Sequence, residues 1–327
     1  MKDLLKNKQF DAGVINGNLD ASDRVDGNWA DSASDALDSV APSGLPCMTF
    51  TGAGEGVEAA IFAAMRERGS DARLSALGFE GSNHGSLALG QWSSLGWPCV
   101  AYPQSAGQEA QILESIRSAV KESREASTPI AAIVIEPTNQ QTGYVASDSF
   151  ISELRSVARD GGAALIVDEQ STCLGASGKG FWQYNGGADF VVFGKRMQVS
   201  GYFSAESDGT RDVNLAGSQL GLRQFSVIKD VVNSRNLIDQ VDRVGKNMES
   251  QASRSAEKSS RITGVRGSGT CLWIDTADAQ AASDLYAHLR ENGVLTQLNG
   301  SRGVMAKPAL TLADSQIGPL SSGLAKF

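Results

Sequence analysis

Three short apolar runs stand out in the middle of the chain, and each reaches a charged residue: 133–137, 165–169 and 190–195. Runs without polar alternation favour strands that are buried on both faces of a parallel sheet. Ligands bind beyond the carboxyl ends of such strands. We therefore expect Glu136, Asp168 and Lys195 to gather at one edge of the sheet.

The segment between the first two runs, 147–161, has apolar residues three and four positions apart, which predicts a helix with one buried stripe. Ser147 can cap its start, and Gly161 can end it. A strand, a helix and a second strand in this order predict a crossover between two parallel strands.

The remainder of the chain predicts a second, smaller unit. A helical pattern covers 227–244 and resembles a long connector, and it is followed by a strand at 271–274, a helix at 278–292 and a strand at 294–296. The sequence therefore predicts a three-part division: a loop-rich N-terminal segment at 1–38, a large domain at 39–224, and a connector helix with a small C-terminal domain at 225–327.

Composition disfavours several classes of partner. A net charge of −8 and a pI of about 4.9 disfavour direct binding to nucleic acid or to an anionic membrane. No apolar run approaches the roughly 20 residues of a transmembrane helix.

Cysteine and histidine usage predicts neither a metal site nor a disulfide framework. The cysteines are scattered, which favours a reducing compartment: Cys47, Cys99, Cys173 and Cys271. The chain has only two histidines, so a multi-histidine metal centre is excluded. Of these, His288 reads as a helix residue, whereas His84 is equally compatible with loop packing and with a cofactor contact.

Lys195 and Asp168 together suggest a specific chemistry. A lysine that attacks an aldehyde must be held at a strand end, and a carboxylate beside it can keep a pyridine nitrogen protonated. Pyridoxal phosphate (PLP) chemistry needs both groups. The alternative is that each residue simply ends a buried strand.

Several ordered motifs strengthen the PLP interpretation, and they extend almost to the C-terminus: 39–45, 51–60, 83–85, 135–137, 166–169, 194–195, 265–270 and 307–310. With them the chain resembles the class III, fold-type I PLP-dependent aminotransferases, and among these the 4-aminobutyrate (GABA) aminotransferases. The resemblance implies an α/β fold, with a mainly parallel sheet between helices in the large domain and a smaller C-terminal α+β domain.

The resemblance also implies roles for individual residues. Lys195 would be the Schiff-base lysine and Asp168 the partner of the pyridinium nitrogen, so these two are the candidate catalytic residues. The implied cofactor contacts are Ala53, Gly54, His84, Asp168, Ser171, Lys195 and Asn214. The implied substrate pocket contains Glu136, Ser86 and Lys307.

Several of these positions depart from the family pattern. Asn83 replaces the aromatic residue that stacks on the cofactor, and Ser86 replaces the arginine that grips the GABA carboxylate. Ser171 stands where a glutamine contacts the phenolic oxygen. Gln170 cannot take over that contact, because adjacent residues in an extended chain face opposite ways. Lys307 replaces an arginine and loses its two-pronged geometry.

Two further departures concern the phosphate, since Asn214 replaces a threonine and Val57 an asparagine. The segment before residue 39 is also shorter than in the family, which predicts a partly dismantled site or one completed by another chain. We therefore expect a degenerate, non-catalytic or weakly active GABA aminotransferase-like subunit, in which the cofactor is either retained or lost. The alternative is an active transaminase with an altered amino donor.

The same reasoning predicts a partner and a compartment. We expect association with another aminotransferase-like chain or a larger assembly. The resemblance to the eukaryotic GABA enzymes favours mitochondria, although residues 1–6 do not form a convincing presequence.

Overall fold

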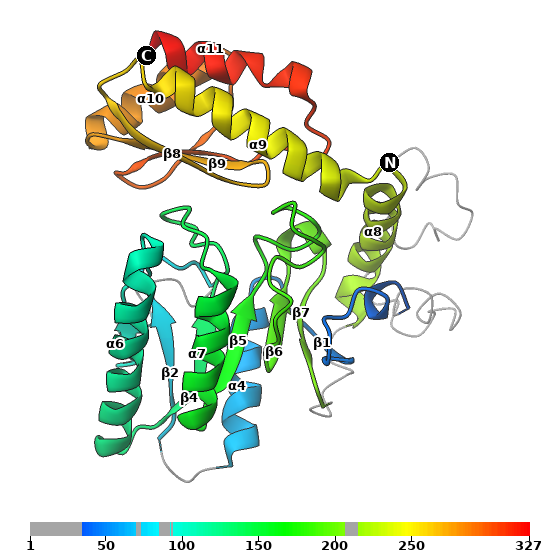
Figure 1. The fold of residues 1–327 in the computed structure, drawn as a ribbon. Coiled ribbons are helices and arrows are strands. Elements are labelled where there is room, and N and C mark those ends of the chain that lie inside the picture. The colour runs from blue at the N-terminus through cyan, green and yellow to red at the C-terminus, as the bar shows by residue number, and fades with distance from the viewer. Residues whose placement is uncertain (1–34, 70–72, 85–91, 93, 207–214) are drawn as a thin grey trace.

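The computed structural model describes residues 35–69, 73–84, 92, 94–206 and 215–327, with the backbone alone for 215–220. Two sheets organise these residues (Figure 1). The larger has seven strands in the order β1-β7-β6-β5-β4-β2-β3, and the smaller has four in the order β10-β11-β9-β8.

The large sheet contains the three predicted apolar runs as neighbouring parallel strands: β4 (Ile130–Ile135), β5 (Ala164–Asp168) and β6 (Phe190–Phe193). Two further parallel strands extend it on one side, β2 (Ser75–Phe79) and β3 (Cys99–Val100). On the other side β7 (Ser200–Ser204) pairs antiparallel to β6, and β1 (Cys47–Thr51) pairs antiparallel to β7.

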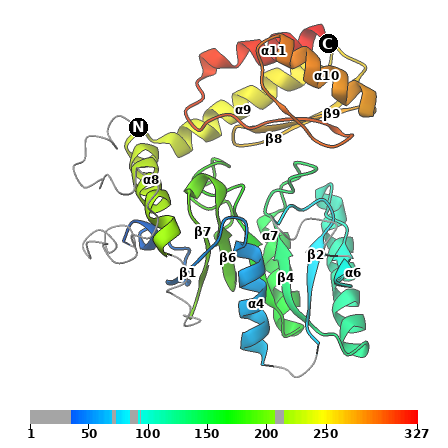
Figure 2. The same cartoon turned by 180° about the vertical axis from the view of Figure 1, so that it is seen from behind.

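Helices cover both faces of the large sheet. Helix α4 (Gly56–Arg68) lies on one face, whereas α6 (Ala106–Glu125) and α7 (Asp148–Asp160) lie on the other, as the two opposite views show (Figures 1 and 2). Alternate residues of β4 enter different cores. Ala132 and Val134 pack with α4, while Ile133 and Ile135 pack on the side of α6 and α7. This two-sided burial explains why the strands lack polar alternation.

Helix α7 forms where its sequence pattern predicts. The Ser147 hydroxyl accepts a hydrogen bond from the Phe150 amide at 3.0 Å, and Gly161 is the C-cap. The Ser147 hydroxyl also donates to the Glu109 carboxylate at 2.6 Å, which ties α7 to α6. The predicted crossover from β4 through α7 to β5 is confirmed.

The predicted connector is two helices rather than one: α8 (Leu215–Ser234) and α9 (Leu237–Ala256). Asn236, with a φ of 49°, turns the chain between them. Because the apolar spacing continues on both sides of this turn, the pattern could not reveal the break. The predicted domain boundary after residue 224 falls within α8, and the division into domains stays a prediction.

The small sheet consists of β8 (Ile262–Ser268), β9 (Cys271–Thr276), β10 (Gln297–Leu298) and β11 (Gly303–Ala306). Helices α10 (Ala279–Glu291) and α11 (Gly318–Lys326) pack with α9 against it. The strand predicted at 294–296 is wrong, because the strand begins at Gln297 and the chain leaves α10 through Gly293 with a φ of 77°. Along the part of the chain that is described, no helix is long and apolar enough to cross a membrane.

Candidate functional site

The candidate catalytic residues lie at the carboxyl ends of β5 and β6. Asp168 pairs in register with Val192, so Ser171 and Lys195 each lie three residues beyond the same registered pair. Lys195 begins a short 3₁₀ turn (Lys195–Met197) and has a φ of 50°, in the left-handed region that residues with a Cβ rarely adopt.

The Lys195 amine has a defined partner. Its Nζ lies 2.7 Å from the Ser171 hydroxyl oxygen. Gln170 lies in a turn rather than in the extended chain that the prediction assumed. Its side-chain oxygen lies 2.9 Å from the Cβ position of Gly194, and the residue is 2% exposed. The lysine amine therefore contacts Ser171, whereas the Gln170 side chain is buried.

Asp168 is a buried carboxylate held from two sides. Its Oδ2 lies 2.8 Å from the His84 Nδ1, and its Oδ1 accepts the Gln170 amide at 3.1 Å. Burial alone would raise the pKa of Asp168, but the hydrogen bond and charge of His84 outweigh it, so the pKa is lowered. Burial opposes a charged His84, but the hydrogen bond to Asp168 and the negative charges of Asp168 and Glu136 together outweigh it, so the pKa of the imidazole is raised.

Glu136 lies at the end of the neighbouring strand and is 2% exposed. Its Oε2 accepts the amides of Asn83 at 3.2 Å and Gln140 at 3.4 Å. Burial raises the pKa of Glu136 to about 7, although the positive charges of His84 and Lys195 oppose the shift. The structure thus brings together all three acids and bases predicted for this edge.

Glu169 is a second buried carboxyl that the sequence did not single out. It accepts hydrogen bonds from the Tyr184 amide at 2.7 Å and from the Thr172 hydroxyl. Burial raises its pKa to about 7. From the sequence alone, an acidic residue directly after Asp168, at the end of a strand, would be expected at the surface. Only the fold shows that the loop after β5 closes over it.

The Gly-rich loop before α4 lies between β1 and the helix. Gly54 has a φ of 83°, and the α4 N-cap residue, Glu55, makes no side-chain capping bond. Ala53 is exposed. A helix start without a side-chain cap can give its backbone N–H groups to an anion. Val57, however, lies inside α4 and is fully buried, so it serves the core rather than the loop.

Lys307 directly follows β11 of the small sheet and contacts the loop after β4 of the large sheet. Its ammonium donates to the Gln140 side-chain oxygen, in the loop after β4, and makes no ion pair with Glu136 among the salt bridges of the described residues. Desolvation lowers the pKa of Lys307. Gln140 was missed from the sequence because it lies 167 positions from Lys307 and carries no local motif.

Two predicted site residues, Ser86 and Asn214, lie outside the described residues. The residue before His84 is an asparagine, so no aromatic ring occupies that position. Within the described part of the chain, no group of three or more His, Cys, Asp or Glu side chains is arranged to hold a metal ion.

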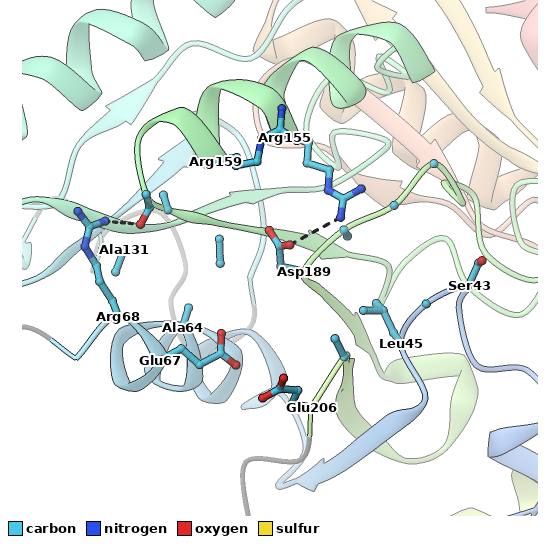
Figure 3. A pocket seen from close by; sticks show the side chains of 18 of the residues that line it. Ser43, Leu45, Ala64, Glu67, Arg68, Ala131, Arg155, Arg159, Asp189 and Glu206 are labelled. Carbon is cyan, nitrogen blue, oxygen red and sulfur yellow. Dashed lines mark hydrogen bonds and ion pairs between the residues drawn. The ribbon is translucent and has the colours of Figure 1, made fainter.

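An open pocket of about 1260 Å³ lies away from this site, at the amino ends of β4, β5 and β6 (Figure 3). Three arginines line it, Arg68, Arg155 and Arg159, and two of them have partners within the fold. Arg155 pairs with Asp189 at 3.8 Å, and Arg68 donates to the Gly162 carbonyl at 2.6 Å. Because the pocket lies at the opposite ends of these strands from Asp168 and Lys195, it does not include the candidate catalytic residues.

The fold is that of a PLP-dependent transferase, and comparison with known families agrees. The model of the class III aminotransferases matches residues 30–327, so the chain belongs to this family. Pyridoxal phosphate is the cofactor of the family.

Individual relatives place the chain near the GABA aminotransferases. It is 29% identical over 245 residues to mitochondrial 4-aminobutyrate aminotransferase from Mus musculus, which covers 68% of this chain and 49% of the mouse protein. A 4-aminobutyrate aminotransferase from Mycosarcoma maydis is 27% identical, covering 86% of this chain and 69% of the fungal protein. The chain thus spans about half the length of the mammalian relatives that it matches.

Solved structures agree on the fold. Lysine aminotransferase from M. tuberculosis has a TM-score of 0.83 at 21% identity, covering 99% of this chain and 85% of that one. A phospholyase from Arthrobacter has a TM-score of 0.76 at 19% identity, covering 92% and 82%.

The residues present fit the cofactor. A carboxylate has about four lone-pair positions, so Asp168 can accept a pyridinium N–H in addition to its bonds to His84 and Gln170. Lys195 offers an exposed amine beside it. The uncapped start of α4 offers backbone donors for a phosphate.

Proposed function

We propose that this chain is a GABA aminotransferase-like protein that keeps a PLP site and has little or no GABA transaminase activity. The observation that carries the cofactor part is the placement of the Lys195 amine and the Asp168 carboxylate at the carboxyl ends of two paired parallel strands, β6 and β5. When bound, the cofactor supplies an electron sink for bonds to an amino carbon.

Each group that this chain contributes to the site would have its own role. Lys195 would hold the cofactor covalently and move a proton at its Nζ. Asp168, kept ionised by His84, would hold the ring nitrogen protonated. The backbone at Ala53 and Gly54 would bind the phosphate.

Loss of GABA recognition follows from the substitutions around this core. Ser86 has neither the charge nor the fork of an arginine for a carboxylate. Lys307 is engaged by Gln140, and Asn83 supplies no stacking ring. Catalysis depends on several positioned groups acting together, so these changes should reduce turnover far more than cofactor binding.

Cofactor binding is tested with purified protein and added PLP. We expect visible absorbance that persists through desalting in the wild type and disappears in Lys195→Ala. Lys229→Ala, at an amine that bonds Ser39 away from the site, is the matched control and should keep the absorbance. Equal spectra for wild type and Lys195→Ala would refute the PLP site.

GABA turnover is tested separately by steady-state assay with GABA and 2-oxoglutarate. Loss of a buried charge pair typically costs about 2–5 kcal/mol, so we expect negligible turnover. A rate of about 1 per second or more would show a working enzyme and reject the degenerate interpretation.

An active transaminase with another amino donor is the second candidate, because Lys307 still places a cation at the edge of the site. A screen of amino donors against the PLP-loaded protein, reading loss of the visible band, separates the two. Conversion by any donor at a rate normal for enzymes favours this candidate.

Association is the remaining part of the proposal. We propose that the chain works as a subunit with another aminotransferase-like chain or within a larger assembly. The relatives named mitochondrial make mitochondria the proposed compartment. Sedimentation of the purified chain should show a stable complex, burying more than about 2,000 Å², which Lys195→Ala leaves intact. A well-behaved monomer would contradict it.

A further inference from the structure

The contact between Lys195 and Ser171 has its origin in the sheet. Parallel pairing of β5 with β6 places Asp168 beside Val192, and both chains then run three residues further. This carries Ser171 and Lys195 to the same level, where Nζ and Oγ lie 2.7 Å apart. Ser171 lies in the turn after β5, and Lys195 begins the 3₁₀ turn after β6, so the backbone of these two turns sets the distance.

The lysine side chain would otherwise have little to hold it. Lys195 is exposed, and ordering a free lysine side chain costs up to about 2 kcal/mol of rotamer entropy. Among the hydrogen bonds of the described residues, the bond to Ser171 is the one that Nζ makes. Gln170 cannot replace it, because that amide packs against Gly194 and is almost fully buried.

We infer that Ser171 is a positioning residue for Lys195: its hydroxyl accepts a hydrogen bond from the amine and aims the amine at an incoming aldehyde. The inference rests on the proposed function only in that the aldehyde is taken to be PLP. Ser171 thus acts on the protein's own nucleophile rather than on the cofactor.

The direction of the hydrogen bond determines whether the amine keeps a free lone pair and can act as a nucleophile. A neutral amine has two N–H groups and one lone pair. When it donates an N–H to Ser171, the lone pair stays free and points away from the hydroxyl. The amine nitrogen then bonds to the aldehyde carbon, and the aldehyde oxygen leaves as water with both amine hydrogens.

The test measures capture of PLP and of pyridoxal, which lacks the phosphate, at Lys195. Borohydride adds hydride to the carbon of the new C=N bond, and a proton from water completes the stable amine, which peptide mass spectrometry locates. We expect Ser171→Ala to slow capture of both aldehydes about three- to tenfold, the effect of losing one hydrogen bond. Ser171→Thr, which keeps the hydroxyl, should restore the rate.

Ser156→Ala, on the exposed face of α7, is the matched control and should match the wild type. Thermal unfolding of each variant checks that it is folded. Capture by Ser171→Ala within twofold of the wild type, or slow capture by Ser171→Thr, would overturn the inference.

Comparing capture of PLP with capture of pyridoxal distinguishes failure of this inference from failure of the proposed function. If PLP and pyridoxal are captured equally fast by the wild type, the proposed phosphate cradle is wrong, while a slower Ser171→Ala still supports the role of Ser171. If the wild type captures neither aldehyde at Lys195, both proposals fall.

Discussion

At the scale of single residues, buried carboxyls make the stability of this chain depend on pH. The pKa of Glu169 is raised by burial from 4.5 to about 7. Between these values the folded chain holds a proton that the unfolded chain has released. The free energy of unfolding must therefore fall as pH rises through this window, and this group contributes a fall of about 3 kcal/mol. Above pH 7 its contribution levels off.

Glu169→Gln should remove that part of the pH dependence. The pKa of Glu136 is also raised to about 7, and that of His84 is raised, so we expect part of the fall in unfolding free energy between pH 5 and pH 7.5 to remain. Urea titration at the two pH values measures it. Glu153→Gln, on the exposed face of α7, is the control, and an unchanged slope in Glu169→Gln would show that Glu169 is ionised when folded.

The candidate site residues that lie at the ends of apolar runs could be predicted from the sequence. Lys195, Asp168 and Glu136 each end an apolar run, and the fold brings them together as expected. The bond between Ser171 and Lys195 was not predicted. Sequence alone gives no measure of how two loops bend beyond the sheet.

At the scale of elements, α7 depends on its first turn. Ser147 accepts the Phe150 amide and donates to Glu109, whose carboxylate also accepts the Ser147 amide at 2.9 Å. Ser147→Ala removes a cap and leaves a buried carboxylate short of a donor. We expect a loss of about 1–3 kcal/mol in the free energy of unfolding by urea titration.

Ser152→Ala, an exposed position one turn further along α7, should change the stability by less than about 0.5 kcal/mol. If both variants are equally stable, the cap is unimportant for α7. The helix itself was predicted because cap, apolar stripe and final glycine agree. The break between α8 and α9 was not, because a single left-handed asparagine leaves no trace in an apolar pattern.

At the scale of the whole molecule, the small sheet meets the large one through Trp273. Its Nε1 donates to the Gln140 carbonyl at 3.0 Å, and its ring lies against Gly143, where a Cβ would come within 2.5 Å of the indole. Gly143 also has a φ of 68°. Gly143→Ala should therefore both strain the backbone and push the two sheets apart.

Gly44→Ala separates the two effects, because Gly44 has a φ of 80° with nothing within 4 Å of its Cβ position. We expect Gly143→Ala to lose about 1–3 kcal/mol more than Gly44→Ala by urea titration, from overpacking. Equal losses would mean that the indole moves aside freely. This contact between distant segments could not be predicted, since nothing in the periodicity of either segment points to the other.

The left-handed backbone of Lys195 bears on how the chain would drift under mutation. A residue with a Cβ in this conformation costs about 1–2 kcal/mol, and glycine or asparagine would relieve it. If no process used the amine, random substitution at this codon would tend to be tolerated or even favoured by stability. We therefore expect Lys195→Gly to be at least as stable as the wild type by urea titration, while losing every reaction of the amine.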